Sequence, residues 1–489
     1  MRPPPILNLV VSSLLQLIFR PPASHRLRSA YRQSQLRSHL EGLVKPIFGG
    51  RRQPLRHFQG LKSPFDGGSA SSSQSGRHQM LRHYAKRGIT SLGEQGSMAV
   101  TASEAIEETT GTRRPNIQSS SSTAPASPPS LSLSSTLSAA SKYGLDPMSN
   151  RFHAPIVYHE QYSFDDWPPN HTFPMDKFER TAYALQTTCK KTLPDISKLS
   201  RPIIRSAQDF YRPLDIEDVP MEWITDIVSK DYVDRFIDGR LSYDEMRQIG
   251  FREQTPRPEL IRRTILEVIG TILACQLATV YGLATNVAGG THHASPTEGA
   301  GYTILNDLAV ASNFITNPKL NNGSVQNIGK VLIADCDVHQ GDGTAKFHNV
   351  ISNDKFITLS IHCESNYPHP KSTSTYDIGL PDGIQDDEYM EILQTTFERV
   401  IAEVQPDFIL YDAGVDIYEN DRLGKLNISE DGIRRRDRYV LETSVSSGIP
   451  IAGVVGGGYD KDVNALARRH CILHEEAAYV WRKYQLWKQ

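Results

Sequence analysis

The distribution of apolar residues along the chain predicts alternating strands and helices in residues 151–489. Short apolar runs bounded by turn residues are typical of buried parallel strands. Such runs occur at 156–158, 286–288, 331–334, 356–361, 408–411 and 449–455. Apolar residues recurring every three or four positions predict helices at 259–281, 387–404 and 430–446. This alternation predicts an α/β fold, in which a single open, mostly parallel sheet has right-handed crossovers and helices on both faces.

Composition divides the chain into three predicted regions. Residues 1–95 form a basic leader, since residues 1–93 contain fifteen Lys or Arg and two acidic residues. Residues 96–150 are rich in Ser, Thr, Ala and Pro, and cannot bury enough apolar surface to offset the entropy lost on ordering. We therefore predict a disordered linker there, followed by one domain over 151–489. The whole chain has a net charge of −2 although its leader is strongly basic, so that domain must be acidic. This acidity argues against nucleic-acid binding.

The leader has the features of a targeting sequence. It is rich in Arg and Ser and poor in acids, as organelle transit peptides are, which predicts a mitochondrion or plastid as destination. The apolar stretch 6–19 is too short for a membrane span but leaves a secretory or bipartite signal open. A later start at Met98 or Met148 would instead favour the nucleus or cytoplasm. Five scattered cysteines indicate a reducing compartment, and we expect no later stretch to be long and apolar enough to span a membrane.

The run 331–334 precedes the residues whose pattern most strongly indicates a chemical function. It leads into Asp335, Asp337 and His339, which occupy alternate positions before a glycine-rich turn. Side chains two residues apart on extended backbone point the same way, so these three can converge on one point. Two carboxylates and an imidazole suit a divalent cation such as zinc. The ordinary alternative is that strand-end acids cap the following turn.

Other polar residues follow the predicted strands in the same way. His292 and His293 follow the run 286–288, Asp416 follows the run 408–411, and Tyr459 follows the run 449–455. In open parallel sheets, ligands bind outside the carboxyl ends of the strands, so these residues are expected to meet in one crevice. Asp416 is the natural third metal ligand. Taken singly, these residues have ordinary explanations as helix caps, surface polar groups or a packed aromatic.

Together these residues fit one reaction class, metal-assisted hydrolysis of an amide. Asp335 and Asp342 are carboxylates that can each orient one of the two imidazoles. The metal would polarise the carbonyl and its bound water, a histidine would take the proton, and the Tyr459 phenol would stabilise the oxyanion.

Four motifs in this order resemble the zinc-dependent histone deacetylase family and its bacterial relatives. They are Gly290–His293, Asp335–Gly343, Gly414–Gly424 and Gly456–Tyr459. The resemblance covers roughly residues 152–480 and implies the arginase/deacetylase fold. It implies zinc bound by Asp337, His339 and Asp416. It also implies a structural potassium ion held by Asp335, Asp337, His339, Ser360 and Ile361.

The resemblance also implies roles for the remaining site residues. His293 would be the general base and acid, with Asp342 behind it. His292 would pair with Asp335, and Tyr459 would donate to the oxyanion.

Details of the motifs resemble a class IV-like branch and its bacterial relatives. These details are Asp421–Ser429, Gly379–Tyr389, and Gln340 in place of a histidine common in class I. Gly301 and Tyr302 resemble the wall of the narrow channel that grips the acyl-lysine stem. In this branch, the group removed is acetyl or a longer acyl chain.

The resemblance implies an acyl-lysine protein, histone or non-histone, as the substrate. Within the same fold, the alternative is hydrolysis of small acetylated amines such as polyamines. An arginase-like enzyme with two manganese ions would need further Asp or His ligands, and Asp412 is the only spare one near Asp416. A catalytically silent acyl-lysine reader would lack a ligand or the tyrosine, and none is missing. The oligomeric state does not follow from the sequence.

Overall fold

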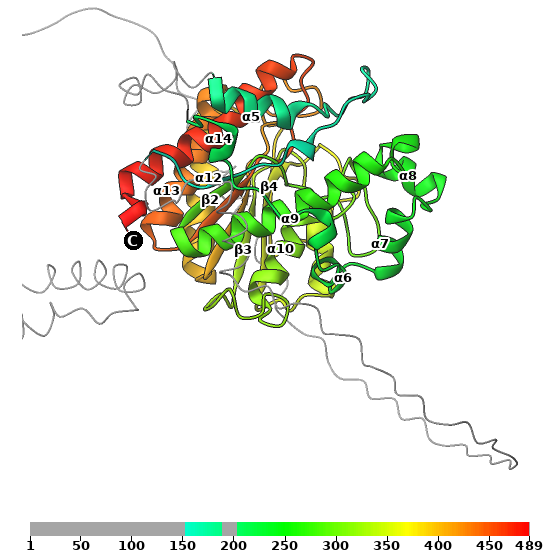
Figure 1. Cartoon of the computed structure of the whole chain (residues 1–489). Helices are drawn as coiled ribbons and strands as arrows, with labels where there is room; N and C mark the ends of the chain where they lie inside the picture. Colours follow the sequence, from blue (N-terminus) through cyan, green and yellow to red (C-terminus); the bar gives the residue numbers. More distant parts are fainter. Residues whose placement is uncertain (1–151, 188–202, 489) are drawn as a thin grey trace, which may run out of the picture. The chain divides into compact units, whose positions relative to one another are not determined.

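The computed structural model describes residues 152–187 and 203–488 (Figure 1). The predicted leader (1–95) and the whole of the predicted linker (96–150) lie outside the described residues, so both remain predictions. The predicted domain is described almost throughout.

The described residues form one all-parallel seven-stranded sheet, which confirms the predicted fold class. The strand order is β1-β2-β7-β6-β3-β4-β5. The strands are β1 (Ile156–Val157), β2 (Leu283–Asn286), β3 (Val331–Asp335), β4 (Phe356–Cys363), β5 (Tyr376–Leu380), β6 (Phe408–Asp412) and β7 (Ile451–Val454). The sequence did not predict β5, and β2 begins three residues earlier than expected. Its apolar face starts at Leu283, directly after the glycine that ends the preceding helix.

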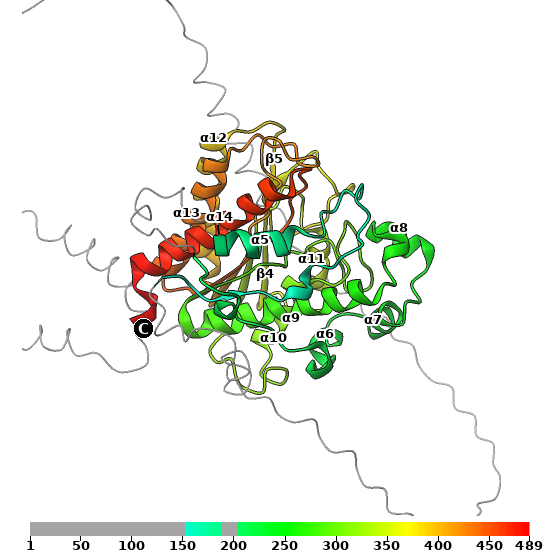
Figure 2. The same cartoon turned by 45° about the horizontal axis from the view of Figure 1, so that its top comes forward.

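Helices cover both faces of this sheet (Figures 1 and 2). α9 (Pro258–Tyr281) and α10 (Asp307–Thr316) lie on one face, and α12 (Asp386–Val404), α13 (Glu430–Ser446) and α14 (Val463–Tyr484) lie on the other. Ser429 caps the N-terminus of α13, because its side chain accepts a hydrogen bond from the Gly432 amide. The remaining helices are α5 (Lys177–Thr187), α6 (Glu222–Thr225), α7 (Lys230–Ile237), α8 (Tyr243–Ile249) and α11 (Asp342–Lys346).

Helix α9 corrects one expectation from the sequence. Among the described residues, it is long and apolar enough to cross a membrane, with a mean hydropathy of 1.6 over its most apolar window. The prediction that no later stretch meets this condition is therefore wrong. In the structure, 83% of that window is buried against the sheet and neighbouring helices, which is the environment of a core helix.

A buried arginine joins the carboxyl ends of β3 and β6. Arg436 of α13 is fully buried. Its guanidinium donates to the carbonyls of Cys336 (3.0 Å), Gly414 (2.6 Å) and Ala413 (3.0 Å), and to Asp437 (2.9 Å). The planar guanidinium has five donors in a fixed geometry, so it holds the loops after the two strands at a set separation.

Replacing Arg436 is expected to destabilise the fold strongly. Arg436→Met leaves Asp437 without its guanidinium partner and three buried carbonyls without donors. Loss of one partner of a buried ion pair costs about 3–5 kcal/mol in free energy of unfolding. Urea denaturation followed by tryptophan fluorescence measures this change.

The matched control is Arg435→Met on the same helix. Arg435 is 41% exposed and its partner Asp387 is 94% exposed, so the expected change is below about 1 kcal/mol. Equal changes in the two variants would contradict the structural role assigned to Arg436.

Candidate functional site

Three side chains that follow β3 and β6 converge as metal ligands do. His339 Nδ1 lies 3.1 Å from Asp337 Oδ1 and 3.2 Å from Asp416 Oδ2, and all three residues are buried. Asp416 Oδ2 forms no hydrogen bond although it is buried. Two carboxylates, one imidazole and an unsatisfied buried oxygen fit a divalent cation such as zinc.

Backbone amides hold the two carboxylates in place. The Val338 amide donates to Asp416 Oδ1 (2.9 Å), and the Gly457 amide donates to Asp337 Oδ2 (2.8 Å). A side chain at Gly457 has no room, since its Cβ would overlap Asp416 Oδ2 and lie 2.5 Å from Asp337 Oδ2. The glycine loop after β7 therefore supports the ligand group directly.

The electrostatics of this group also favour a cation. Burial, followed by repulsion from Asp337, raises the pKa of Asp416 to about 7. Burial opposes the charge on His339, but the two carboxylates raise its pKa to about 9. The two carboxylates thus favour the protonated, positively charged form of the His339 imidazole. A bound cation would supply that positive charge instead.

Each of the two adjacent histidines has its own carboxylate partner. His292 Nδ1 lies 2.9 Å from Asp335 Oδ2, and His293 Nδ1 lies 2.7 Å from Asp342 Oδ1. The structure therefore brings together the pairs that the sequence analysis expected. A carboxylate on Nδ1 leaves Nε2 as the atom available for chemistry in each ring.

The environments of the two imidazoles push their pKa values apart. Burial, followed by the neighbouring charge of His292, lowers the pKa of His293 to about 3. Burial acts against protonation of His292 too, but Asp335 and Asp337 raise its pKa well above the usual range. A neutral imidazole beside a protonated one is the arrangement expected of a base and an electrostatic partner.

Tyr459 lies at the end of the glycine loop after β7, close to the ligand group. Its ring centroid is 6.2 Å from that of His339 and 6.0 Å from that of Tyr302, and only 7% of the residue is exposed. Burial raises the pKa of the phenol well above its usual value. The hydroxyl therefore stays protonated and remains a hydrogen-bond donor.

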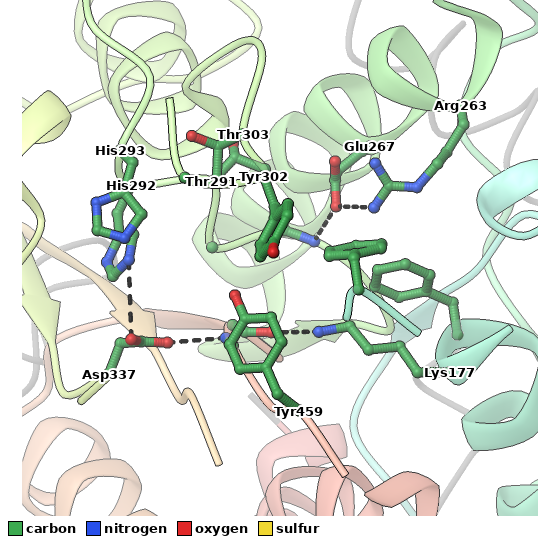
Figure 3. A pocket seen from close by; sticks show the side chains of 17 residues that line it. Lys177, Arg263, Glu267, Thr291, His292, His293, Tyr302, Thr303, Asp337 and Tyr459 are labelled. Atoms are coloured by element: carbon green, nitrogen blue, oxygen red, sulfur yellow. Dashed lines mark hydrogen bonds and ion pairs between the residues drawn. The ribbon is translucent and has the colours of Figure 1, made fainter. Parts of the chain in front are cut away.

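His292, His293, Asp337 and Tyr459 line one cavity with a volume of about 30 Å³ (Figure 3). Its wall includes Gly301 and Tyr302, the predicted channel residues, together with His293 and Tyr459. Gly301 adopts a φ of +55°, and a Cβ there would lie 2.5 Å from His293 Cδ2. A glycine is thus required where the wall meets His293. The far end of the cavity is charged and is formed by Lys177, Arg263 and Glu267.

The predicted potassium residues lie beside the ligand group. Asp335 on β3 pairs in register with Ser360 on β4, and Ile361 follows it. All three residues are buried, and Ser360 Oγ also lies 3.0 Å from His362 Nδ1. The structure places the predicted side chains together, while the ion itself remains a prediction.

The sequence analysis missed two residues at the site. The Tyr367 ring lies edge-on to His293, with centroids 4.8 Å apart, and is 42% exposed. Lys177 is buried and donates to the Gly456 carbonyl at 3.0 Å. Neither residue carries a signal, since one lies in an irregular loop and the other in an amphipathic helix.

Asp412 was noted as a spare carboxylate, but its environment could not be foreseen. It is fully buried and neither of its oxygens accepts a hydrogen bond. With His292 and Asp335 it forms a second group of potential ligand atoms, all within 4.8 Å of one another.

Fold and site together define a deacetylase-like hydrolase. The family model described as the histone deacetylase domain matches residues 175–474. The chain is 41% identical to an uncharacterized protein from Picosynechococcus over 328 residues, covering 67% of this chain and 99% of that protein. It is 32% identical to "Histone deacetylase 2" of Arabidopsis thaliana over 198 residues, covering 40% and 49% respectively. The chain belongs to the histone deacetylase family, whose members are generally zinc-dependent.

We predict that Gly457→Ala abolishes metal binding while leaving the fold intact. The added methyl displaces both Asp416 and Asp337, which are short side chains held by backbone amides and cannot move independently. Zinc content after dialysis against a limiting zinc buffer should fall at least about tenfold, the size of effect seen when support of metal ligands is lost.

The control is Gly329→Ala, where the new methyl meets only Asp407 Oδ2 at 3.3 Å on the surface. This variant should bind zinc as the wild type does. Zinc binding by Gly457→Ala at wild-type affinity would show that Asp337 and Asp416 are not the ligands.

Proposed function

We propose that the protein is a zinc-dependent hydrolase that removes acetyl groups from lysine side chains of proteins. The observation that carries this proposal is the meeting of three groups at one cavity. These are the ligand group Asp337–His339–Asp416, the pair His293–Asp342 and the phenol of Tyr459, which line the cavity through Asp337, His293 and Tyr459. Each part of amide hydrolysis then has a residue suited to it.

Zinc fits the ligand group by donor type, number and charge. Asp337, His339 and Asp416 would hold it and leave an open position towards the cavity. When bound, zinc supplies a Lewis acid that polarises the amide carbonyl and lowers the pKa of water. Since no fourth side chain joins the ligand group among the described residues, the geometry suits catalysis better than a closed structural site.

His293 is the residue we assign to proton transfer. Its imidazole is neutral, because burial and the charge of His292 lower its pKa, so it can accept a proton from water. Asp342 holds the ring through Nδ1 and would stabilise the imidazolium that forms. The same ring would then return the proton to the leaving lysine amine, as the reaction requires.

His292 and Tyr459 are assigned to stabilising charge. His292, held by Asp335, contributes positive charge beside the reacting carbonyl. Tyr459 would donate its hydroxyl hydrogen to the oxyanion that develops when the carbonyl is attacked. A structural potassium ion at Asp335, Ser360 and Ile361 would lie behind this machinery and offset part of its buried negative charge.

The substrate assignment depends on the dimensions and lining of the cavity. Tyr302 lines the cavity and Tyr367 packs against His293, and these aromatic surfaces suit the aliphatic stem of a lysine. The whole cavity holds about 30 Å³, and its lining includes Lys177 and the Arg263–Glu267 ion pair. A methyl group fits this space, whereas a long hydrocarbon chain would have to bury against charges. We therefore favour acetyl over long acyl groups.

We also propose that the leader directs the protein to a mitochondrion or plastid. The support is its Arg-rich, acid-poor composition. In that compartment, acetylated organellar proteins would be the substrates and nuclear histones would not.

Tyr459→Phe is expected to remove most of the activity on an acetyl-lysine peptide. Loss of one oxyanion donor lowers kcat by about 10²–10³-fold. The full-length, zinc-loaded protein is assayed on acetyl- and myristoyl-lysine peptides and on an acetylated polyamine. We expect the acetyl peptide to be the best of the three substrates.

The control for this assay is Tyr183→Phe. Tyr183 lies on α5 and is 66% exposed, so its hydroxyl has no part in the site and activity should be unchanged. A better rate on the polyamine would replace the protein substrate with a small amine. No turnover on any of them, with zinc bound, would favour a silent acyl-lysine reader.

The targeting proposal predicts that residues 1–100 fused to a fluorescent reporter accumulate in a mitochondrion or plastid. The same fusion with the leader's arginines replaced by glutamines should remain in the cytosol, since transit peptides depend on positive charge. A diffuse nuclear and cytosolic signal from the unaltered fusion would contradict the proposal.

A further inference from the structure

We infer that Asp421 is a positioning residue that fixes Tyr459 in its active orientation. This inference rests on the proposed function, because it concerns the residue assigned to the oxyanion. Asp421 lies five residues after the ligand Asp416, in a motif to which the mechanism assigns no role.

Two consecutive residues, Asp421 and Arg422, bind the backbone amide and carbonyl of Tyr459. The Tyr459 amide donates to Asp421 Oδ2 at 2.7 Å. The Tyr459 carbonyl accepts a hydrogen bond from the Arg422 amide at 3.2 Å. Both backbone polar groups of Tyr459, one in each peptide unit that flanks its Cα, are thus tied to the segment 421–422, and the Cα–Cβ direction of Tyr459 is set by that segment.

The Asp421 carboxylate is itself held rigidly. Its other oxygen accepts hydrogen bonds from the amides of Leu423 (2.8 Å) and Gly424 (3.0 Å). Gly424 in turn lies against the carbonyl of Asp416, where an added Cβ would overlap the oxygen. Asp421 therefore connects the loop that carries a metal ligand to the loop that carries the tyrosine.

The sequence before Tyr459 explains why these hydrogen bonds are needed. Three glycines precede it, and Gly456 adopts a φ of +60°, so this backbone is intrinsically permissive. The closest fixed point before Tyr459 is Gly457, whose amide and carbonyl are bound by Asp337 and the Val415 amide. The second fixed point is Asp421. Without it, the Tyr459 amide would lose its partner, and the position of the hydroxyl would depend on the Arg422 hydrogen bond and on ring packing.

Ring packing alone gives weak positional control over a hydroxyl at the end of a long side chain. The Tyr459 ring contacts Tyr302, His339 and the Lys177 ammonium at centroid distances of 6.0, 6.2 and 5.9 Å. These contacts are apolar or weakly directional. A small backbone rotation at Cα is amplified at the hydroxyl, and a displacement of about 1 Å at a catalytic group can cost about 10²-fold in rate.

The test is a double-mutant cycle on the full-length zinc-loaded enzyme. Asp421→Asn replaces an accepting oxygen with an NH₂ group that cannot accept from the backbone amides. We expect kcat on the acetyl-lysine peptide to fall about 10–100-fold, with KM changed less than about twofold. In the Tyr459→Phe background, the same substitution should lower kcat less than about threefold further, because the group it positions is already absent.

Asp386→Asn is the matched control. Asp386 also accepts a hydrogen bond from a backbone amide, that of Ser429 at 2.8 Å, but it touches no residue of the site. It should lower thermal stability about as much as Asp421→Asn and leave kcat unchanged. If Asp421→Asn does not fold, Asp421→Glu, which keeps the charge and shifts it by one methylene, is measured in the same cycle.

Two results would overturn the inference. One is a full, multiplicative loss of kcat from Asp421→Asn in the Tyr459→Phe background. The other is a crystal structure of Asp421→Asn in which the Tyr459 side chain keeps its wild-type position. The crystal structure needs no turnover, so the inference is tested even if the wild type proves inactive and the proposed function fails.

Discussion

The site depends first on the guanidinium of Arg436, which lies beneath the carboxyl ends of β3 and β6. Its N–H groups donate to the carbonyls of Cys336, Ala413 and Gly414. Each of these residues lies within two positions of a buried aspartate of the site. Parallel strands deliver their polar residues to one edge of the sheet, but sheet geometry alone leaves the loops beyond them free. Because one rigid, charged group ties both loops, the spacing of Asp337 and Asp416 is set by the fold before any metal binds.

Concentrating acids at this edge has an electrostatic cost, and several parts of the structure offset it. Asp335, Asp337, Asp412 and Asp416 are all buried, and burial raises the pKa of Asp416 to about 7 and that of Asp412 well above its usual value. The buried acids favour the protonated form of the neighbouring imidazoles, whose positive charge reduces the repulsion between the acids. A divalent cation at the ligand group offsets the same repulsion, so metal binding and stability of the fold are linked.

The sequence allowed the chemically distinctive part of the site to be predicted. Asp335, Asp337 and His339 alternate at a strand end, and that spacing has few explanations other than convergence. Tyr367, by contrast, packs against His293 from a long loop whose conformation depends on tertiary contacts. Lys177 is a charged residue on an amphipathic helix, where a sequence predicts exposure, yet it is buried. β5 was missed because its residues are only partly buried at the sheet edge and lack a continuous apolar run.

The loop after β7 shows why some functional residues leave no chemical signal. Glycine is needed at 457 because the backbone passes directly over the carboxylates of Asp416 and Asp337, and at 456 because it passes over Asp412 and Gly414, so a Cβ at either position would collide. That requirement makes the loop permissive at the point where the tyrosine must be most precisely held. Rigidity then has to come from outside the loop, through backbone hydrogen bonds to Asp421 and Arg422. A carboxylate that binds amides looks in sequence like any loop aspartate, so its role emerges only from the three-dimensional contacts.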